Sequence, residues 1–341
     1  MPQAMPLRMG RGNPVYLSRS EALVNMKTHI RTVMEHYKDS VISWDVVNEA
    51  MQDGPPAVSD WKDALRKSPW YYSVGPDFVE QAFLAAREVV DNNQNLKGIK
   101  LYYNDFNDEF PEKRDAIHDM VKEMNDRYAD AHPGKLLVDG IGLQSHYDMR
   151  TKPANVEAAI EKYASLGVEI SISELDVLAG MNSSLSPEWA EKQASLYAQL
   201  FQIYKKHADK KSRVSPSGVT RTASSWRSSQ NPLPFLSSLA PKPAYYAIID
   251  PEKYLAEHPL YITPETKSST ALYGTPDIDG SMDDIWKNAP EIQIDNHLMA
   301  TAETAGIART LWDEENLYVL FQVKDKQLSK KTIQIRQSRI Q

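Results

Sequence analysis

The sequence predicts an α/β fold in which parallel strands alternate with helices. Short apolar runs rich in β-branched residues, such as 168–173, are typical of buried strands. Each is followed by a longer segment with apolar residues at helical spacing, and this alternation occurs four times, at about 35–55 residues per unit. Because crossover connections are right-handed, the units predict one parallel sheet. The predicted strands end in polar residues, which is where parallel α/β proteins carry their chemistry.

The N-terminal part of this pattern predicts a capped helix and the first strand. Ser18 can cap a helix over 18–37, because Glu21 stands three residues later and completes a capping box. The apolar run 41–47 then predicts a strand that ends in a polar pair. The segment 51–69 is rich in Pro and Asp, so we expect a loop that shapes the site above this strand.

The following units repeat the pattern. Helices are expected where apolar residues recur every three or four positions, and strands where short apolar runs separate them. The predicted helices are 76–90, 112–128, 153–166 and 187–207, and the strands between them are 100–103, 138–143 and 168–173. The first 15 or so residues look irregular and are assigned no structure.

Two glutamates stand at the ends of predicted strands, far apart in the sequence. Glu49 follows the strand 41–47, and Glu174 follows the strand 168–173. A single glutamate at a strand end is usually a solvated carboxylate or a salt-bridge partner. A pair of them is what a glycosidase with two catalytic carboxyl groups needs. Asn48 beside the first and Asp176 near the second favour this interpretation.

Composition and charge exclude several classes of protein. The chain has 341 residues and a net charge of −7 with both signs scattered, which argues against a nucleic-acid partner. The absence of cysteine excludes disulfides and thiolate metal sites. No apolar run approaches the ~20 residues of a membrane helix. The first residues lack the apolar core of a signal peptide.

Four motifs follow one another in a characteristic order. They are Trp44-Asp-Val-Val-Asn-Glu49, Leu101-Tyr-Tyr-Asn-Asp-Phe-Asn107, Gly140-Ile-Gly-Leu-Gln-Ser-His146 and Ile172-Ser-Glu-Leu-Asp176. Together they resemble the endo-1,4-β-xylanases of glycoside hydrolase family 10, over about residues 17–251. The resemblance implies a partial TIM (β/α)8 barrel comprising strands 4 to 8 only. It also implies retaining hydrolysis of xylan by a two-glutamate double displacement, with no cofactor and no metal.

The resemblance also assigns roles to individual residues. Glu49 is expected to be the acid/base and Glu174 the nucleophile. The expected supporting residues are Asn48, His146 and Asp176, and the expected substrate-binding residues are Gln144, Phe106 and Trp226. A lone histidine is more often a satisfied core residue, but a histidine at a strand end beside Gln144 favours the family role. Asn104, Asp105 and Asn107 are expected to brace loops rather than touch substrate.

The chain departs from the family pattern at both ends of the predicted barrel. The family's first three strands, which supply donor-side sugar contacts, would precede residue 17, so the sequence predicts a chain truncated at the N-terminus. In 217–226 the expected Trp-Gly pair is missing, with Thr220 as the candidate end of the eighth strand. The match resumes in 241–248, the usual final helix. Since catalysis depends on positioning, we expect this chain to fold poorly alone and to have little activity.

Composition changes again after the barrel-like part. The predicted domains are a partial catalytic domain (1–250), a linker (251–270), a partial carbohydrate-binding module (271–330) and an irregular tail (331–341). The third of these resembles the start of a family 9 carbohydrate-binding module, which is a β-sandwich. Alternating apolar residues in 317–323 predict a strand there. Trp286 and Trp312 are expected in the core of the module.

The expected partner is xylan or a xylo-oligosaccharide, with no nucleic acid and no membrane. Because insoluble xylan cannot enter a cell, the full-length parent is expected to be extracellular. Three alternatives stay open. The barrel could act on β-1,4-glucan. The chain could be a non-catalytic carbohydrate-binding remnant, although the module's sugar-clamping tryptophans would lie beyond residue 330. It could also be a fragment without a function of its own.

Overall fold

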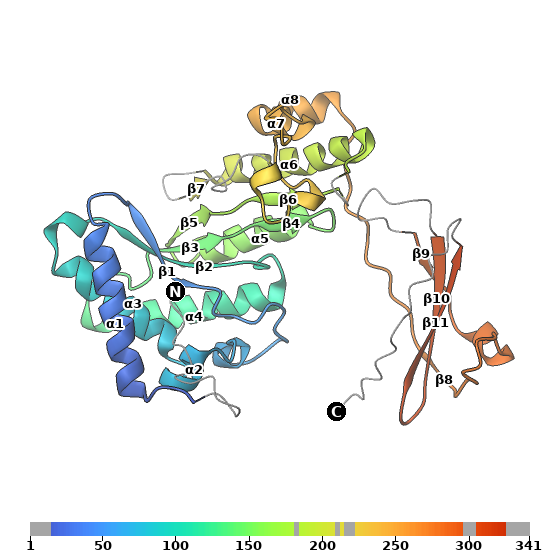
Figure 1. The fold of residues 1–341 in the computed structure, drawn as a ribbon, viewed down its shortest axis with the longest axis horizontal. Coiled ribbons are helices and arrows are strands. Elements are labelled where there is room, and N and C mark those ends of the chain that lie inside the picture. Colours follow the sequence, from blue (N-terminus) through green and yellow to red (C-terminus); the bar gives the residue numbers. More distant parts are fainter. Residues whose placement is uncertain (1–14, 181–183, 209–211, 215–221, 296–304, 325–341) are drawn as a thin grey trace. The chain divides into compact units, whose positions relative to one another are not determined.

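A computed structural model describes residues 15–180, 184–208, 212–214, 222–295 and 305–324. The chain divides into two compact units, Met1–Tyr261 and Ile262–Gln341, which are described separately (Figure 1). Among the described residues, no helix is both long enough and apolar enough to cross a membrane. The N-terminal segment, the predicted strand end at Thr220 and the expected tail 331–341 lie outside the described residues.

A five-stranded parallel sheet forms the centre of the first unit (Figure 1). Its order, β1-β2-β3-β5-β7, follows the chain, as successive right-handed strand–helix units require. The strands are β1 (Ser43–Asn48), β2 (Lys100–Asp105), β3 (Gly140–Leu143), β5 (Glu169–Ile172) and β7 (Ser212–Val214). All neighbours pair in parallel, which confirms the four predicted strands up to β5 and their direction, whereas a strand at 212–214 was not predicted. A second, two-stranded parallel sheet pairs β4 (His146–Asp148) with β6 (Asp176–Leu178).

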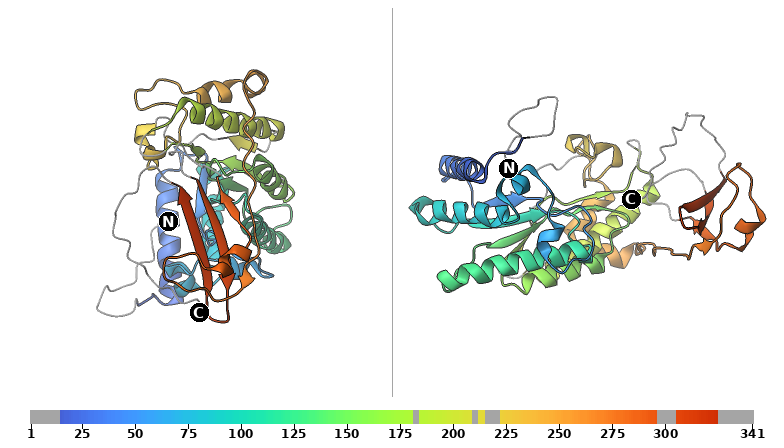
Figure 2. Two further views of the ribbon diagram at one scale, coloured as in Figure 1. Left: turned by 90° about the vertical axis from the view of Figure 1, so that its right-hand side faces the viewer. Right: turned by 90° about the horizontal axis from the view of Figure 1, so that it is seen from below.

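The helices of this unit pack on one another beside the sheet (Figure 2). The α-helices are α1 (Arg19–His36), α2 (Pro69–Val74), α3 (Phe78–Asp91), α4 (Pro111–Ala131), α5 (Pro153–Ala164), α6 (Pro187–His207), α7 (Pro243–Ile249) and α8 (Pro251–Glu257). Short 3₁₀ helices of this unit span Trp61–Ala64, Gln94–Leu96, Thr222–Ser224 and Ser228–Gln230, and the second unit has one at Asp284–Asn288. Among the helices, α1 packs on α3, α4 on α5, and α5 on α6.

Local sequence signals account for the start of α1. Ser18 accepts from the backbone N–H of Glu21, and the Glu21 side chain accepts from the backbone N–H of Ser18 at 3.1 Å, so the predicted capping box is confirmed.

The predicted loop 51–69 contains a short 3₁₀ helix and the first residue of α2. Trp61 and Trp70 are both buried there, so they pack the loop onto the unit.

The prediction of a linker over 251–270 is wrong for its first part. Helix α8 occupies Pro251–Glu257 and packs on α6 and α7. Beyond it, the Tyr261 hydroxyl donates to the carbonyl of Met149 at 2.7 Å, and the Tyr261 N–H donates to Ser195 Oγ at 2.8 Å. The first unit therefore extends to Tyr261. A helix of seven residues is too short to show a periodic apolar pattern, which is why the sequence did not indicate it.

The second unit is a four-stranded sheet with a small core on one side. It contains β8 (Leu272–Tyr273), β9 (Ile292–Ile294), β10 (Ala305–Trp312) and β11 (Leu317–Lys324), with β10 in the middle. Trp286, Ala289 and Leu311 form the core, so the prediction for Trp286 is confirmed. The prediction for Trp312 is wrong, because its side chain is 45% exposed. As the neighbour of Leu311 on a strand, it points to the opposite face of the sheet.

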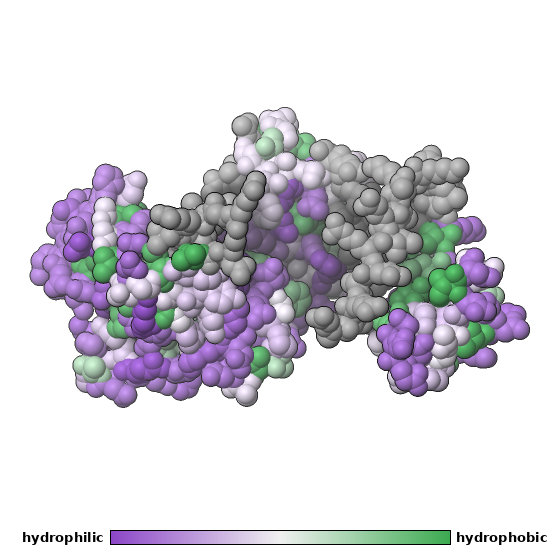
Figure 3. Space-filling model, turned by 60° about the horizontal axis from the view of Figure 1, so that its bottom comes forward, coloured by the Kyte–Doolittle hydropathy of each residue, from purple (hydrophilic) through white to green (hydrophobic). Residues whose placement is uncertain are grey.

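That opposite face is apolar and exposed. Along β11, Leu317, Val319, Phe321 and Val323 alternate with the inward residues and are 46–60% exposed. The antiparallel register places Trp312 directly across from Leu317, so the tryptophan belongs to the same face. Hydrophobic surface gathers on this unit in the right-hand part of Figure 3. An apolar face of this kind on a sheet normally packs against another layer of structure.

Candidate active site

The carboxyl ends of the central strands bring several polar side chains together. Glu49 directly follows β1 and has a φ of 58°, in the left-handed region that non-glycine residues adopt mainly at functional or strained sites. Its N–H donates to the carbonyl of Asn104 on β2 at 2.9 Å, which holds this conformation. Glu174 follows β5. The side chains of Glu49 and Glu174 are 33% and 43% exposed, so both carboxylates reach solvent.

Three amide side chains connect the two glutamates. Asn104 Nδ2 donates to Glu174 Oε1 at 3.1 Å and to Asn48 Oδ1 at 2.9 Å. Gln144 Nε2 donates to the same Asn48 oxygen and to Glu49 Oε1, both at 3.1 Å. Asn48 Oδ1 therefore accepts from both amides at the centre of a continuous chain. Each side chain fixes the orientation of the next, which positions the two carboxylates relative to each other.

Asn104 has a more direct part in the site than the sequence indicated. Its side chain contacts Glu174 itself, and Ser173 Oγ donates to its Oδ1 at 2.7 Å. Gly142 on the neighbouring strand makes room for it, since a Cβ there would collide with Asn104 Oδ1. Asn107 does brace a loop as predicted, because its Nδ2 donates to the carbonyl of Asp53 at 3.2 Å.

His146 lies between two carboxylates. The pairing of β4 with β6 sets it beside Asp176, with Nδ1 3.2 Å from Asp176 Oδ1, while Nε2 lies 3.4 Å from Glu174 Oε2. Burial opposes a charge on the imidazole. The close contacts with the carboxylates of Asp176 and Glu174 outweigh burial and raise the pKa of His146 to about 9. At neutral pH the residue is therefore an imidazolium.

The same contact acts on Glu174. The hydrogen bond from His146 lowers the pKa of Glu174, and it outweighs the opposing effect of burial with help from Asn104. Asp45, on β1, shows the reverse: burial and the negative charge of Glu174 both raise the pKa of Asp45. The site thus keeps one glutamate ionised by giving it a cation and an amide as partners.

Trp226 and its neighbour Arg227 complete this side of the site. The Trp226 ring is 78% exposed and meets the His146 ring edge-on, with centroids 5.7 Å apart. Arg227 Nη1 donates to Asp176 Oδ1 at 2.7 Å, and the Arg227 guanidinium lies over the Trp226 ring, 5.0 Å from its centroid. Trp226 therefore presents an aromatic surface beside His146, with its neighbour anchored to β6.

Comparison with known families identifies two regions of the chain. Residues 11–251 match the model described as glycosyl hydrolase family 10. The chain belongs to glycosyl hydrolase family 10. This membership implies a (β/α)8 barrel. Residues 278–336 match a second model, described as carbohydrate family 9 binding domain-like, so the family 10 region is followed by the start of such a domain.

Curated relatives and solved structures that this chain resembles are named as xylanases or, in one case given below, as an exoglucanase. This family 10 chain is 36% identical over 316 residues to endo-1,4-beta-xylanase A of Thermoanaerobacterium saccharolyticum, covering 90% of this chain and 24% of the relative. It is 37% identical over 316 residues to exoglucanase XynX of Acetivibrio thermocellus, covering 90% and 26%. The chain therefore spans about a quarter of the length of these relatives.

Among solved structures, TsXylA, an intracellular xylanase of T. saccharolyticum, has a TM-score of 0.59 at 36% identity, covering 69% of this chain and 68% of that chain. Mutants of that xylanase were solved in complex with xylotetraose and with xylotriose. A family 10 xylanase from termite gut that contains a bacterial Ig-like domain has a TM-score of 0.62 at 34% identity, covering 70% and 56%.

Arg66 lies beside Glu49, and the sequence did not single it out. Its Nη1 lies 3.5 Å from Glu49 Oε2, its Nη2 donates to Asp53 at 2.6 Å, and its Nε donates to the carbonyl of Met51 at 2.7 Å. The residue comes from the loop after β1, whose polar composition gave no reason to prefer one cation over another. Arg66 thus holds a positive charge beside Glu49.

Phe106, expected to bind substrate, lies between two cations. Arg66 Cζ is 5.4 Å and Lys113 Nζ 4.1 Å from the centroid of its ring. Lys113 is fully buried and pairs with Asp105 at 2.8 Å. This ion pair joins the end of β2, directly before Phe106, to α4. It therefore fixes the position of Phe106 next to the strand ends.

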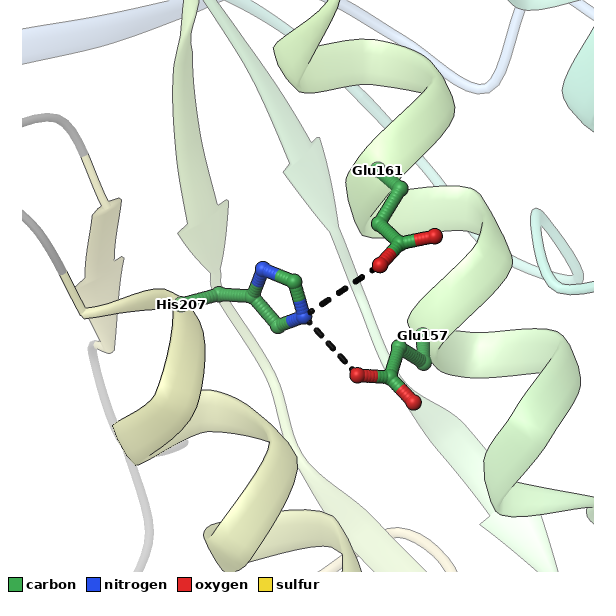
Figure 4. Close-up of side chains that lie close together, drawn as sticks. All are labelled: Glu157, Glu161 and His207. Atoms are coloured by element: carbon green, nitrogen blue, oxygen red, sulfur yellow. Dashed lines mark hydrogen bonds and ion pairs between the residues drawn. The ribbon is translucent and has the colours of Figure 1, made fainter.

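A separate cluster of charged side chains lies on the outside of the unit, between α5 and the end of α6 (Figure 4). His207 Nε2 is 3.0 Å from Glu157 Oε1 and 3.9 Å from Glu161 Oε1. Lys206 Nζ is 2.6 Å from the same Glu157 oxygen. Because an ammonium already neutralises Glu157, these contacts form an ion-pair network that joins the two helices.

Proposed function

We propose that this chain is the part of an endo-1,4-β-xylanase that carries both catalytic glutamates, with which the enzyme cleaves internal β-1,4-xylosidic bonds with retention. The observation that carries this proposal is the pair Glu49 and Glu174, joined through Asn104, Asn48 and Gln144. The xylanase names of the relatives support the choice of substrate. In this proposal the five parallel strands are strands 4 to 8 of the barrel, and the second unit begins a β-sandwich module.

Glu174 would act as the nucleophile. His146 and Asn104 keep it ionised, so it can attack the anomeric carbon and form a glycosyl-enzyme. Glu49 would protonate the leaving oxygen in that step. It would then take a proton from the water that releases the sugar. Asp176 would orient His146 for this purpose, in the way that a carboxylate orients a catalytic imidazole.

The remaining residues would bind the sugar. Since Asn48 Oδ1 accepts from both neighbouring amides, its NH₂ group is left to donate to the sugar 2-hydroxyl, a contact that strengthens in the transition state. The exposed ring of Trp226 would stack on a xylose beside His146. Phe106 and Gln144 would contact the chain of sugars on either side of the reacting bond.

Two glutamine variants test the roles separately. Glu174→Gln removes the nucleophile, so hydrolysis of both xylan and an aryl xylobioside with an activated leaving group should be lost. Glu49→Gln removes the acid, so xylan hydrolysis should be lost. The activated aryl substrate should still release its phenol in the first step, because that leaving group needs no proton. Equal loss on both substrates in both variants would contradict the assignment.

A second candidate function is β-1,4-glucan hydrolysis, which the name of the relative XynX favours. A xylanase and a β-1,4-glucanase differ in whether the site admits a hydroxymethyl group on each sugar ring. The ratio of kcat/KM for xylo- and cello-oligosaccharides of equal length decides between them, and the xylanase proposal expects a ratio well above one. A ratio below one would make the chain a glucanase.

The partner and location are part of the same proposal. The expected ligand is xylan or a xylo-oligosaccharide, with no nucleic acid and no membrane. The polymeric substrate supports an extracellular full-length parent. Immunodetection of the parent in culture medium, against a cytoplasmic marker, tests this, and retention inside the cell would contradict it.

A further inference from the structure

Arg227 contacts two members of the site, Asp176 and Trp226, and its own neighbour Ser225. Its Nη1 donates to Asp176 Oδ1 at 2.7 Å, the oxygen that also faces His146 Nδ1. Its guanidinium lies over the Trp226 ring, and the Arg227 N–H donates to Ser225 Oγ at 3.1 Å. The side chains of Arg227 and Asp176 are only 18% and 4% exposed, so this is a largely buried ion pair.

We propose that Arg227 is a positioning residue for Glu174, which holds Asp176 beside His146 and, by its positive charge, sets the pH at which His146 loses its proton. This inference rests on the proposed role of Glu174 as nucleophile. It adds Arg227 as the residue that adjusts the proton affinity of His146, the partner of that nucleophile. Arg227 acts through Asp176 and His146 and touches no reacting atom.

The argument starts from the charges that face His146 in the described residues. Glu174 comes from the end of β5, Asp176 from β6, and Arg227 from the segment after Thr222–Ser224. Two negative charges favour the imidazolium, and the one positive charge opposes it. Because Arg227 shares an oxygen of Asp176 with His146, it offsets the carboxylate that favours the protonated ring most directly.

This balance matters for both steps of a retaining reaction. An imidazolium beside Glu174 keeps the nucleophile ionised in the first step, and it stabilises the carboxylate that leaves the sugar in the second. A neutral histidine would remove the cation altogether. By limiting the proton affinity of His146, Arg227 fixes the upper pH at which Glu174 still has a cationic partner.

The inference is tested by titrating His146 in the full chain. The imidazole Cε1–H signal is followed by NMR against pH and assigned with His146→Asn. Arg227→Gln keeps a hydrogen-bond donor for Asp176 and removes the charge, so the pKa of His146 should rise by about 1 unit. Arg227→Lys keeps the charge and should leave the pKa of His146 within about 0.3 units of the parent chain.

Two outcomes would overturn the inference. One is a pKa of His146 that is unchanged or lowered in Arg227→Gln. The other is an equal shift in the glutamine and lysine variants, which would mean that Arg227 acts by shape alone. The titration requires no turnover, so it stays informative even if the chain hydrolyses no xylan. Failure of the proposed function would be detected in a separate experiment, the activity assay that compares the parent chain with Glu174→Gln.

Discussion

Raising the pH from 6.5 to 9.5 should destabilise the first unit through His146. The pKa of this residue is about 9 in the folded chain, against ~6.5 in an unfolded one. The folded state binds the proton more tightly, so the stabilisation is fully present below ~6.5 and is lost as the pH rises through about 9. The difference sets an upper limit of ~3 kcal/mol. Because the Glu174 side chain is 43% exposed, solvent screening reduces this to about 1–2 kcal/mol.

The assay compares urea unfolding of the parent chain and His146→Asn at the two pH values. The comparison is needed because other groups titrate in this range. Burial lowers the pKa of Lys242 to about 7, so its contribution to stability rises with pH above 7, opposite in sign to that of His146. Burial raises the pKa of Glu109 from 4.5 to about 7, so the stability that this group adds at acid pH is lost by about pH 7 and changes little above it. These effects are common to both proteins, and only the parent should lose the additional 1–2 kcal/mol. The same loss in both proteins would refute the reasoning.

Three further predictions follow from buried contacts and exposed surface. Lys113→Met leaves the carboxylate of Asp105, which is 1% exposed, without its cation and should cost about 3–5 kcal/mol in urea unfolding. Gly142→Ala places a Cβ against Asn104 Oδ1 and should reduce the rate of glycosyl-enzyme formation roughly tenfold, because the amide chain between the glutamates is displaced. Phe321→Lys puts a charge on the exposed face of β11 and should reduce self-association in sedimentation velocity.

Matched variants serve as controls for these predictions. Gly54→Ala adds a Cβ where no atom lies within 4 Å, so it should leave the rate unchanged. A Gly142→Ala protein as fast as this control would contradict the role given to Asn104. Gln322→Lys adds the same charge next to Phe321 on the other face of β11, and equal effects of the two lysines would show that net charge alone controls self-association. Full stability of Lys113→Met would contradict the buried ion pair.

Local signals allowed much of the fold and the candidate site to be predicted. The capping box at Ser18 and Glu21 depends only on residues three apart, and it forms as expected. The strands are short apolar runs, so their ends, and with them the polar residues that follow, could be located in the sequence. Glu49, Gln144 and Glu174 come together because neighbouring parallel strands end on the same side of a sheet.

Features that depend on distant partners were missed. Asn104 was expected to brace a loop, yet its amide contacts Glu174, seventy residues away, because Gly142 leaves space for it. Arg66 was one of several cations in a polar loop, and only the folded backbone brings it to Glu49. Trp312 was expected in a core because it stands at a structural position of the family 9 module that this segment resembles. The side to which it points is set by the strand register, which composition does not specify.

The most direct test of the central claim is covalent trapping of the nucleophile. The chain is incubated with an activated 2-deoxy-2-fluoro-β-xylobioside, whose fluorine slows release of the glycosyl-enzyme, and is analysed by intact mass and peptide mapping. The account predicts a single added fluoroxylobiosyl group located on Glu174, and no adduct in Glu174→Gln. An adduct on a different carboxylate, or none on a chain that unfolds cooperatively, would contradict it.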